Sequence, residues 1–230
     1  MKISIILYAR NREQDIELTF NSIQEAINEN PQFEYEIIFV NDQSTDETLV
    51  KMQQFASVVI TTKGQHGINN AIFSGLDESR GDIFFPIPGH DMFKKDAISK
   101  VISNCSNKKI TIGFRSNLRQ ARPIVKFISS RLLLLIYRII TGNEVKDIHG
   151  LVAYPTKLLR DTDRTKIGHG FHMIPITLAL SQGYELHQIS IKMNELHTKR
   201  SGMKKRDYFP AFSAILDVIG QIKYANKLAE

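Results

Sequence analysis

The sequence predicts an α/β fold in which helices cover both faces of a mostly parallel central sheet. Short apolar runs rich in β-branched and aromatic residues alternate with segments whose apolar residues recur at helical spacing, and this order repeats four times between residues 2 and 115. The runs contain few polar residues, as expected of strands that are buried on both faces. Repeated strand–helix units of this kind are typical of parallel sheets.

The first half of the chain follows this pattern throughout. We expect strands at residues 2–8, 36–40, 57–62, 82–87 and 109–115, and helices at 11–31, after Ser44, at 67–80 and around 97–102. In the first helix, Asn11 is the expected cap, and Ile16, Phe20, Ile23 and Ile27 form one apolar stripe. The sequence Ser44-Thr45-Asp46-Glu47 is typical of a capping box, which predicts that the second helix begins there.

The second half is less regular. A long helix is expected from about Pro123 to Thr141, where Gly142 ends it, and further elements are expected at 151–154, at 171–182 and around Ile189 to Met193. Helical spacing returns in the tail from Tyr208. No repeat or linker separates the halves, so we expect a single domain over residues 1–230, with a nucleotide-sugar-binding half at 1–115, an acceptor-side half at 116–206 and a terminal helix at 207–230.

The composition is that of an ordinary globular protein, with 42% hydrophobic and 23% charged residues. The single cysteine, Cys105, excludes an internal disulfide and fits a reducing compartment. The longest apolar run, Leu132–Ile136, is far shorter than the roughly 20 residues that span a bilayer. We therefore expect a cytoplasmic protein that does not cross a membrane.

The net charge of +6 is concentrated in two basic segments, Lys108–Arg138 and Lys199–Arg206, neither of which contains an acidic residue. Basic clusters of this kind suit phosphate-bearing ligands, an anionic membrane surface or nucleic acid, and they also occur as simple solvated faces. The clusters lack interleaved aromatic residues, which argues against nucleic acid as the partner.

Asp42 follows an apolar strand directly, which predicts a carboxylate at the carboxyl edge of the sheet, where open α/β sheets bind their ligands. Asp is also common in turns for purely local reasons, and that reading stays open. The first strand ends in Tyr8-Ala9-Arg10-Asn11 without a glycine. Neither a dinucleotide-binding fingerprint nor a P-loop occurs in the sequence, which argues against both of those nucleotide-binding classes.

Several segments together resemble a known family. SIILYARNRE, EIIFVNDQSTDET, the Gly67–Gly75 segment and GDIFFPIPGHD resemble the inverting family-2 glycosyltransferases of GT-A fold. The later segments GFR, ISSRLLLLIYRIITG, VKDIHG and HTKRSGMKK are similar to the polyprenol-phosphate sugar transferases, the dolichol-phosphate mannose synthase group. The resemblance covers Ile3 to Lys205. It implies an enzyme that moves a sugar from a nucleotide-diphosphate sugar to a polyprenyl phosphate in cell-surface glycan synthesis.

The resemblance also implies roles for particular residues. The residues implied in nucleotide-sugar binding are Tyr8, Ala9, Arg10, Asp42, Gly67 and Asn70. Those implied near the reacting groups are Asp91, Arg115, Arg131 and Asp147, and those implied in a loop over phosphates are Arg200, Ser201, Gly202 and Lys204. Arginine suits such positions because its planar fork binds two phosphate oxygens at once.

The main departure from the family concerns its metal site. The family has an Asp-x-Asp motif that holds Mg²⁺ or Mn²⁺ against the diphosphate, whereas this chain has Pro88-Gly89-His90 followed by Asp91. His90 and Asp91 are the candidate ligands for such an ion, since imidazole accepts Mn²⁺ and a carboxylate suits both ions. The alternative is that the basic clusters neutralise the diphosphate without a metal. The changed motif also admits a protein with altered or lost catalysis.

Two other functions stay open. The same fold can transfer sugar to a glycan or lipid hydroxyl, for which Asp147 or His149 would serve as the base. A nucleotide-sugar-binding protein or an inactive partner subunit is the other. Because a polyprenol acceptor stays in the bilayer, we expect peripheral binding at the inner membrane face through residues 126–138 and the tail from Tyr208, with a partner membrane protein or a second copy as possible partners.

Overall fold

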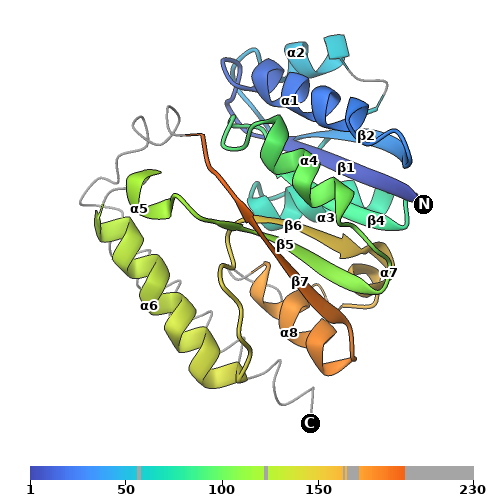
Figure 1. Ribbon diagram of the computed structural model, residues 1–230. Helices are drawn as coiled ribbons and strands as arrows, with labels where there is room; N and C mark the ends of the chain where they lie inside the picture. Colours follow the sequence, from blue (N-terminus) through green and yellow to red (C-terminus); the bar gives the residue numbers. More distant parts are fainter. Residues whose placement is uncertain (56–57, 122–123, 163, 165–170, 195–230) are drawn as a thin grey trace.

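The computed structural model describes residues 1–55, 58–121, 124–162, 164 and 171–194. They form one seven-stranded sheet in the order β3-β2-β1-β4-β6-β5-β7 (Figure 1). Neighbouring strands are parallel except for β6, which is antiparallel to both β4 and β5. The predicted mostly parallel sheet is therefore confirmed.

The strands are β1 (Lys2–Ala9), β2 (Glu34–Asn41), β3 (Val59–Thr61), β4 (Ile83–Pro88), β5 (Lys109–Arg115), β6 (Leu151–Pro155) and β7 (Glu185–Ile191). The helices are α1 (Ile16–Asn28), α2 (Thr48–Phe55), α3 (Ile68–Glu78), α4 (Lys95–Ser103), α5 (Leu118–Ala121), α6 (Ile124–Thr141), α7 (Thr156–Arg160) and α8 (Met173–Ser181). Most elements lie within a few residues of the predicted bounds.

Each face of the sheet has its own hydrophobic core. On one face, α1, α2 and α4 cover the sheet with buried side chains such as Ile23, Met52 and Ile98. On the other, α3, α6, α7 and α8 do so with side chains such as Leu76 and Tyr137 (Figure 1). Helices on both faces explain why the strand sequences are apolar on successive residues.

Two predicted helix starts are wrong. α1 begins at Ile16, not near Asn11, and α2 begins at Thr48, so the capping box at Ser44 does not form. Asn11 and Ser44 bond with the opposite loop instead: the backbone N–H of Asn11 donates to the Ser44 hydroxyl at 3.1 Å, and the Thr45 N–H donates to the Asn11 side chain at 2.8 Å. These residues join the two loops at the strand ends and do not cap helices.

Three smaller expectations also differ from the structure. Helical spacing places Ile68 on the same face of α3 as the buried Ala71 and Ile72, but Ile68 is 61% exposed. The last strand, β7, begins at Glu185, earlier than its alternating residues indicated, and Met193 is buried beyond its end. The short helices α5 and α7 were not predicted. The tail from Tyr208 lies outside the described residues.

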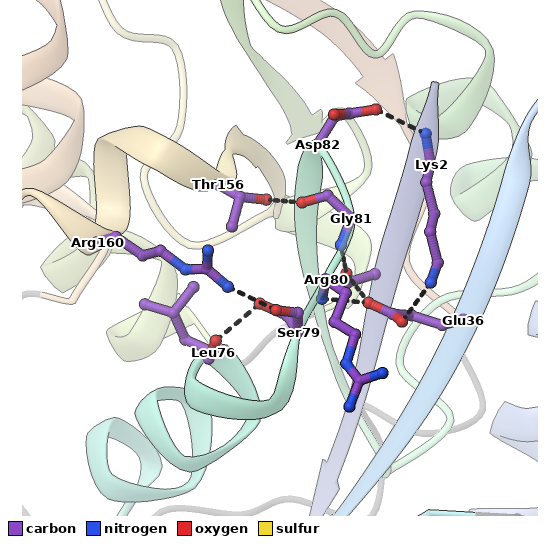
Figure 2. A network of polar contacts seen from close by, with 10 residues as sticks. Lys2, Glu36, Leu76, Ser79, Arg80, Gly81, Asp82, Thr156 and Arg160 are labelled. Atoms are coloured by element: carbon purple, nitrogen blue, oxygen red, sulfur yellow. Dashed lines mark hydrogen bonds and ion pairs between the residues drawn. The ribbon is translucent and has the colours of Figure 1, made fainter.

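The amino-terminal edge of the sheet is held by a polar network (Figure 2). Glu36 of β2 accepts hydrogen bonds from the Ser4 hydroxyl and the Arg80 N–H and pairs with Lys2 at 2.7 Å. Gly81 donates its N–H to Ser4 Oγ at 2.8 Å, and the Thr156 hydroxyl donates to the Gly81 carbonyl at 2.7 Å. The network therefore connects β1, β2, β4 and α7 at the edge opposite the predicted ligand site.

Replacing Gly81 with alanine is expected to destabilise the fold by about 2 kcal/mol or more. A Cβ there would lie 2.6 Å from Ser4 Oγ and 2.8 Å from the Lys2 carbonyl oxygen, so the network would have to separate. Urea unfolding followed by circular dichroism measures the loss. Arg80→Ala is the matched control, because the contact of Arg80 with Glu36 uses the backbone N–H. Equal stability of the two variants would contradict this account.

Candidate functional site

Residues with a strained, left-handed backbone conformation lie at the carboxyl edge of the sheet. Apart from glycines, the described residues with a positive φ are Asn11 (52°), Gln43 (56°) and Asp91 (48°). Each lies two or three residues beyond the end of a strand, β1, β2 or β4 respectively. Left-handed residues of this kind are uncommon and tend to occur at functional sites, where the surrounding contacts hold them. This edge is where the sequence placed the ligand site.

Asp42 connects β2 to the start of α3. Its carboxylate accepts the Gly67 N–H at 2.9 Å and the Thr62 hydroxyl at 2.9 Å. An anion at the amino end of a helix is stabilised by the helix dipole, so Asp42 fixes where α3 begins. Asp42 is buried and does not line the cavity beside it. Nucleobase contact by Asp42 therefore stays a prediction.

A cavity of about 770 Å³ opens at this edge. Of the residues predicted to bind a nucleotide sugar, Tyr8, Gly67 and Asn70 line it. Ala9 is buried and Arg10 is exposed, and neither belongs to its wall. Its size is within the range of small-molecule sites, roughly 300–1,000 Å³. The structure thus brings three of the six predicted residues to one cavity wall.

Other residues that line this cavity, which we call the main cavity, had no role indicated by the sequence. They are Ile148 and, at the start of α8, Phe171, His172 and Met173. His149, a candidate base in the sequence, lines it as well. His172 Nδ1 lies 2.6 Å from the Tyr154 hydroxyl. Burial, and then the charge of His149, lower the pKa of His172 from 6.5 to about 3, so this imidazole is neutral at physiological pH. The sequence predicted only a helix here, because its local signal is apolar.

Arg115 and Asp147 form a buried ion pair. Arg115 Nε donates to Asp147 Oδ2 at 2.6 Å, and Nη2 donates to Oδ1 at 2.9 Å. Burial alone would raise the pKa of Asp147, but the hydrogen bonds and charge of Arg115 outweigh it and lower that pKa to about 2. Arg115 Nη1 is buried and has no partner among the described residues. Asp147 is therefore a fixed anion, and one guanidinium nitrogen is left for a ligand or water.

A close backbone approach places this pair. A Cβ at Gly150 would lie 1.9 Å from the Gly113 carbonyl oxygen, so only glycine lets the loop after Asp147 approach β5. The His149 N–H also donates to Asp147 Oδ1, at 3.1 Å. These contacts explain the glycine of the VKDIHG segment, and they fix the turn of residues 147–149.

A second, smaller cavity of about 330 Å³ is lined by the ion pair and by cations. Arg131 and Arg138 of α6 line it together with Arg115 and Lys146. Arg138 Nε donates to the Val145 carbonyl at 2.8 Å, and the Arg131 guanidinium lies 5.5 Å from the centre of the Phe127 ring. The structure therefore brings Arg115, Arg131 and Asp147 to one cavity and adds Lys146, whereas Asp91, also expected near the reacting groups, does not line it. Their role in the reaction stays a prediction. We call this second cavity the basic cavity.

The end of β4 does not offer the oxygen ligands that Mg²⁺ or Mn²⁺ prefers. Asp91 is the one carboxylate of the 88–91 segment, and it already binds Lys94 and Asn194. Within the described residues, no group of three or more His, Cys, Asp or Glu side chains could hold a metal ion. The residues present at this position fit a divalent ion poorly.

Helix α6 has two different apolar sides. Leu133, Leu134 and Tyr137 are buried, whereas Leu132 and Leu135 are 51% and 53% exposed. An apolar run such as Leu132–Ile136 would ordinarily pack in the core, and here only part of it does. The exposed stripe consists of Ile124, Ile128, Leu132, Leu135 and Ile139.

No helix in the described part of the chain is both long enough and apolar enough to cross a bilayer.

The predicted phosphate loop, with Arg200, Ser201, Gly202 and Lys204, lies outside the described residues.

The fold is that of an α/β protein with a cavity at the carboxyl edge of a mostly parallel sheet. The model of the family described as glycosyl transferase family 2 matches residues 4–156, and the chain belongs to this family. The predicted family is therefore confirmed.

Curated relatives are similar over part of their length. The chain is 26% identical to a dolichol-phosphate mannosyltransferase of Pyrococcus furiosus over 179 residues, which are 73% of this chain and 50% of that protein. It is 33% identical to a prophage bactoprenol glucosyl transferase homolog of Escherichia coli over 92 residues, 38% of this chain and 30% of that protein. The chain thus spans half or less of the length of these relatives.

Solved structures share the GT-A fold. Glucosyl-3-phosphoglycerate synthase from Mycobacterium tuberculosis, crystallised with Mn²⁺, UDP and glucosyl-3-phosphoglycerate, matches with a TM-score of 0.69 at 17% identity, over 96% of this chain and 80% of that chain. The same enzyme with Mg²⁺ and UDP matches with a TM-score of 0.65 and covers 96% of this chain and 79% of that chain. At this identity the likeness shows the fold alone.

Acidification is expected to weaken the fold through Asp147. Its folded pKa of about 2 lies below its ordinary 3.8, so the stability it contributes is complete above about pH 5 and is lost as the pH falls through 2. The loss is roughly 2 kcal/mol, measured by urea unfolding across this pH range. In Asp147→Asn the free energy of unfolding should fall less between pH 5 and pH 2 than in the wild type. Asp161→Asn, at an exposed pair with Lys157, should show the same fall as the wild type. An equal fall in Asp147→Asn and the wild type would contradict the assignment.

Proposed function

We propose that this protein is an inverting glycosyltransferase that moves a sugar from a nucleotide-diphosphate sugar to a polyprenyl phosphate during cell-surface glycan synthesis. The observation that carries the proposal is the position of the 147–149 turn between the two cavities. Asp147 lines the basic cavity, and His149, two residues away, lines the main cavity. In this arrangement the donor lies in the main cavity and the phosphate of the acceptor lies in the basic one.

The basic cavity suits a phosphate monoester. Arg115, Arg131, Arg138 and Lys146 supply four positive charges against the single carboxylate of Asp147. The unpartnered Nη1 of Arg115 gives a further donor at the same place. Hydrogen bonds from arginine to phosphate are charge-assisted and are about twice as strong as neutral ones.

The reaction follows from this placement. An acceptor phosphate oxygen forms a bond to the anomeric carbon of the sugar, while the bond from that carbon to the nucleotide diphosphate breaks and the diphosphate leaves with the electron pair. One displacement inverts the configuration at carbon. The acceptor is already an anion at neutral pH, so no protein base has to remove a proton. The chain supplies orientation and charge stabilisation.

The low pKa of Asp147 weighs against this residue as the base in the rival reaction, in which a hydroxyl is the acceptor. Transfer to a hydroxyl needs a base, and Asp147 and His149 were the two candidates. A carboxylate with a pKa of about 2, held by Arg115, is a weak base near neutral pH. A phosphate acceptor avoids this difficulty, and the two curated relatives are named for polyprenol substrates.

We assign residues 1–115 mainly to donor binding, with residues 148–149 and 171–173 adding to the donor cavity, and residues 116–206 mainly to the acceptor side of one domain. For the diphosphate, the sequence left two alternatives: a divalent ion held by His90 and Asp91, or the cations of the protein itself. The contacts of Asp91 favour the second alternative.

Transfer of labelled sugar from uridine and guanosine diphosphate sugars to a short polyprenyl phosphate tests the function. Arg131→Ala is expected to lower kcat/KM for the acceptor by about tenfold to a hundredfold, since it removes a charged hydrogen bond worth about 1.5–3 kcal/mol. Arg131→Lys keeps the charge but loses the planar fork of the guanidinium, so its kcat/KM for the acceptor should lie between those of the wild type and Arg131→Ala. Arg119→Ala, at an exposed arginine outside the basic cavity, is the control.

The outcome also separates the alternatives. Transfer to a glycan hydroxyl with none to polyprenyl phosphate would support the rival enzyme. Binding of the donor without transfer to either would support a nucleotide-sugar-binding protein.

We further propose that the exposed stripe of α6 lies against the inner face of the membrane. The stripe extends along the helix at steps of three and four residues, and Arg131 and Arg138 lie on the adjoining face, where they also reach the basic cavity. An apolar stripe beside basic residues is the pattern of an interfacial helix at anionic lipid. The acceptor phosphate, which the bilayer retains, would then meet the arginines at the surface.

Replacing Leu132 with aspartate should weaken binding to anionic vesicles by about tenfold, because burial of one leucine is worth roughly 1.5–3 kcal/mol. Co-sedimentation with anionic and neutral vesicles, at low and high salt, measures the effect. Leu18→Asp replaces a leucine of similar exposure, 48%, on α1 and should bind as the wild type does. Equal loss in both variants, or no binding by the wild type at low salt, would refute the role of α6.

A further inference from the structure

We infer that Asp91 is a clamp residue, not a metal ligand, and that this chain binds the diphosphate of its donor without a divalent ion at the end of β4. The clamp joins the loop after β4 to the Met193–Asn194 segment beyond β7. The inference about the diphosphate rests on the proposed function, whereas the clamp stands on the contacts of Asp91 alone.

Both oxygens of Asp91 are already occupied. Lys94 Nζ donates to Oδ1 at 2.9 Å and to Oδ2 at 2.8 Å, and Asn194 Nδ2 donates to Oδ2 at 2.8 Å. An ammonium group thus lies where a divalent ion would have to bind. The carboxylate is 9% exposed, so its ligands come from the protein and only slightly from water. To accept a metal ion, Asp91 would have to release both donors.

The polar contacts continue along the backbone. The Asn194 side chain also donates to the Asp91 carbonyl at 3.0 Å, and the Asn194 N–H donates to the Met92 carbonyl at 2.8 Å. The Asp91 N–H donates to the Thr19 hydroxyl of α1 at 2.9 Å, which holds Asp91 in its left-handed conformation. Asp91 therefore connects α1, the end of β4 and the chain beyond β7.

A second clamp supports the same segment. Asn117, just after β5, donates its Nδ2 to the Met193 carbonyl at 3.0 Å and accepts the Met193 N–H at 2.8 Å. The segment 193–194 is thus held by Asn117 on one side and by Asp91 on the other. Repeated side-chain bonds to backbone groups fix the path of a segment. This is a structural use of Asp91 that a metal would disrupt.

The remaining residues of this segment do not complete a metal site. Pro88 and Gly89 carry no metal-binding side chain, and a Cβ at Gly89 would lie 2.9 Å from Ala9 Cβ, so that position is closed to a larger residue. His90 offers one imidazole, but among the described residues no group of three or more His, Cys, Asp or Glu side chains could hold a metal ion with it. A divalent ion bridged to a diphosphate needs several oxygen ligands to offset its charge. Lys63, which lines the main cavity, is a cation of the protein that can face the diphosphate instead.

Calorimetry of the full chain with UDP and with GDP tests the diphosphate half of the inference. The Kd is expected to agree within about twofold between buffer with Mn²⁺ and buffer with EDTA. A Kd that is tenfold or more weaker in EDTA, with the difference abolished by Asp91→Asn, would overturn it. Failure of both nucleotides to bind in either buffer would count against the proposed function. In that case, titration of the protein with Mn²⁺ alone decides whether a divalent ion binds at the end of β4. Stoichiometric Mn²⁺ binding that Asp91→Asn abolishes would overturn the inference. No Mn²⁺ binding would support it.

Thermal unfolding tests the clamp without any nucleotide. Asp91→Asn and Lys94→Gln should each lower Tm by a few degrees, by the same amount with Mn²⁺ and with EDTA. Lys95→Gln is the matched control, since Lys95 pairs with Glu29 at the surface at 3.0 Å. A Tm unchanged in Asp91→Asn, or one that Mn²⁺ raises in the wild type only, would overturn the clamp.

Discussion

Arg115 and Asp147 are both charged and both buried, and neither would be stable there without the other. Taking a charge out of water costs several kcal/mol, which is offset here by two side-chain hydrogen bonds in fork geometry and a third from the Arg115 N–H at 3.1 Å. The pair fixes the loop before β6 against the end of β5. Because the 147–149 turn forms part of both cavities, their relative position depends on this one interaction.

The two edges of the sheet are built differently. At the amino edge, Glu36, Ser4 and Gly81 satisfy one another within the network of Figure 2, and the contacts are short and local to three neighbouring strands. At the carboxyl edge, strained residues such as Asn11 and Gln43 are held by contacts between loops. A rigid edge of this kind allows the opposite edge to carry strained loops without loss of the fold.

Much of the fold could be predicted because strands buried on both faces are apolar at nearly every position, as in β1 and β5. The starts of α1 and α2 could not be predicted from the sequence. Asn11 and Ser44 form a hydrogen bond with each other across more than thirty residues, and a local sequence pattern does not reveal such a contact. The insertion of β6 between β4 and β5 is also a matter of long-range pairing.

Some residues of the candidate site could likewise be predicted from the sequence, and others could not. Tyr8 and Gly67 reach the main cavity because the edge of a parallel sheet places them there, and the sequence shows that edge directly. The position of His172 depends on how α8 packs against the sheet. The sequence alone therefore could not show that His172 lines the main cavity. Asp42 was correctly located at the edge, but its partner Gly67, 25 residues on, emerges only in three dimensions.

Helix α6 carries the arginines of the basic cavity and the exposed apolar stripe on adjoining sides of one rigid rod. A helix with its side chains is about 10–12 Å across, so the two sides are separated by less than that distance. The height of the cavity above any surface that the stripe contacts is therefore set by the width of a helix. If the stripe contacts a membrane, as proposed above, an acceptor phosphate at the level of the headgroups lies within about one helix width of these arginines.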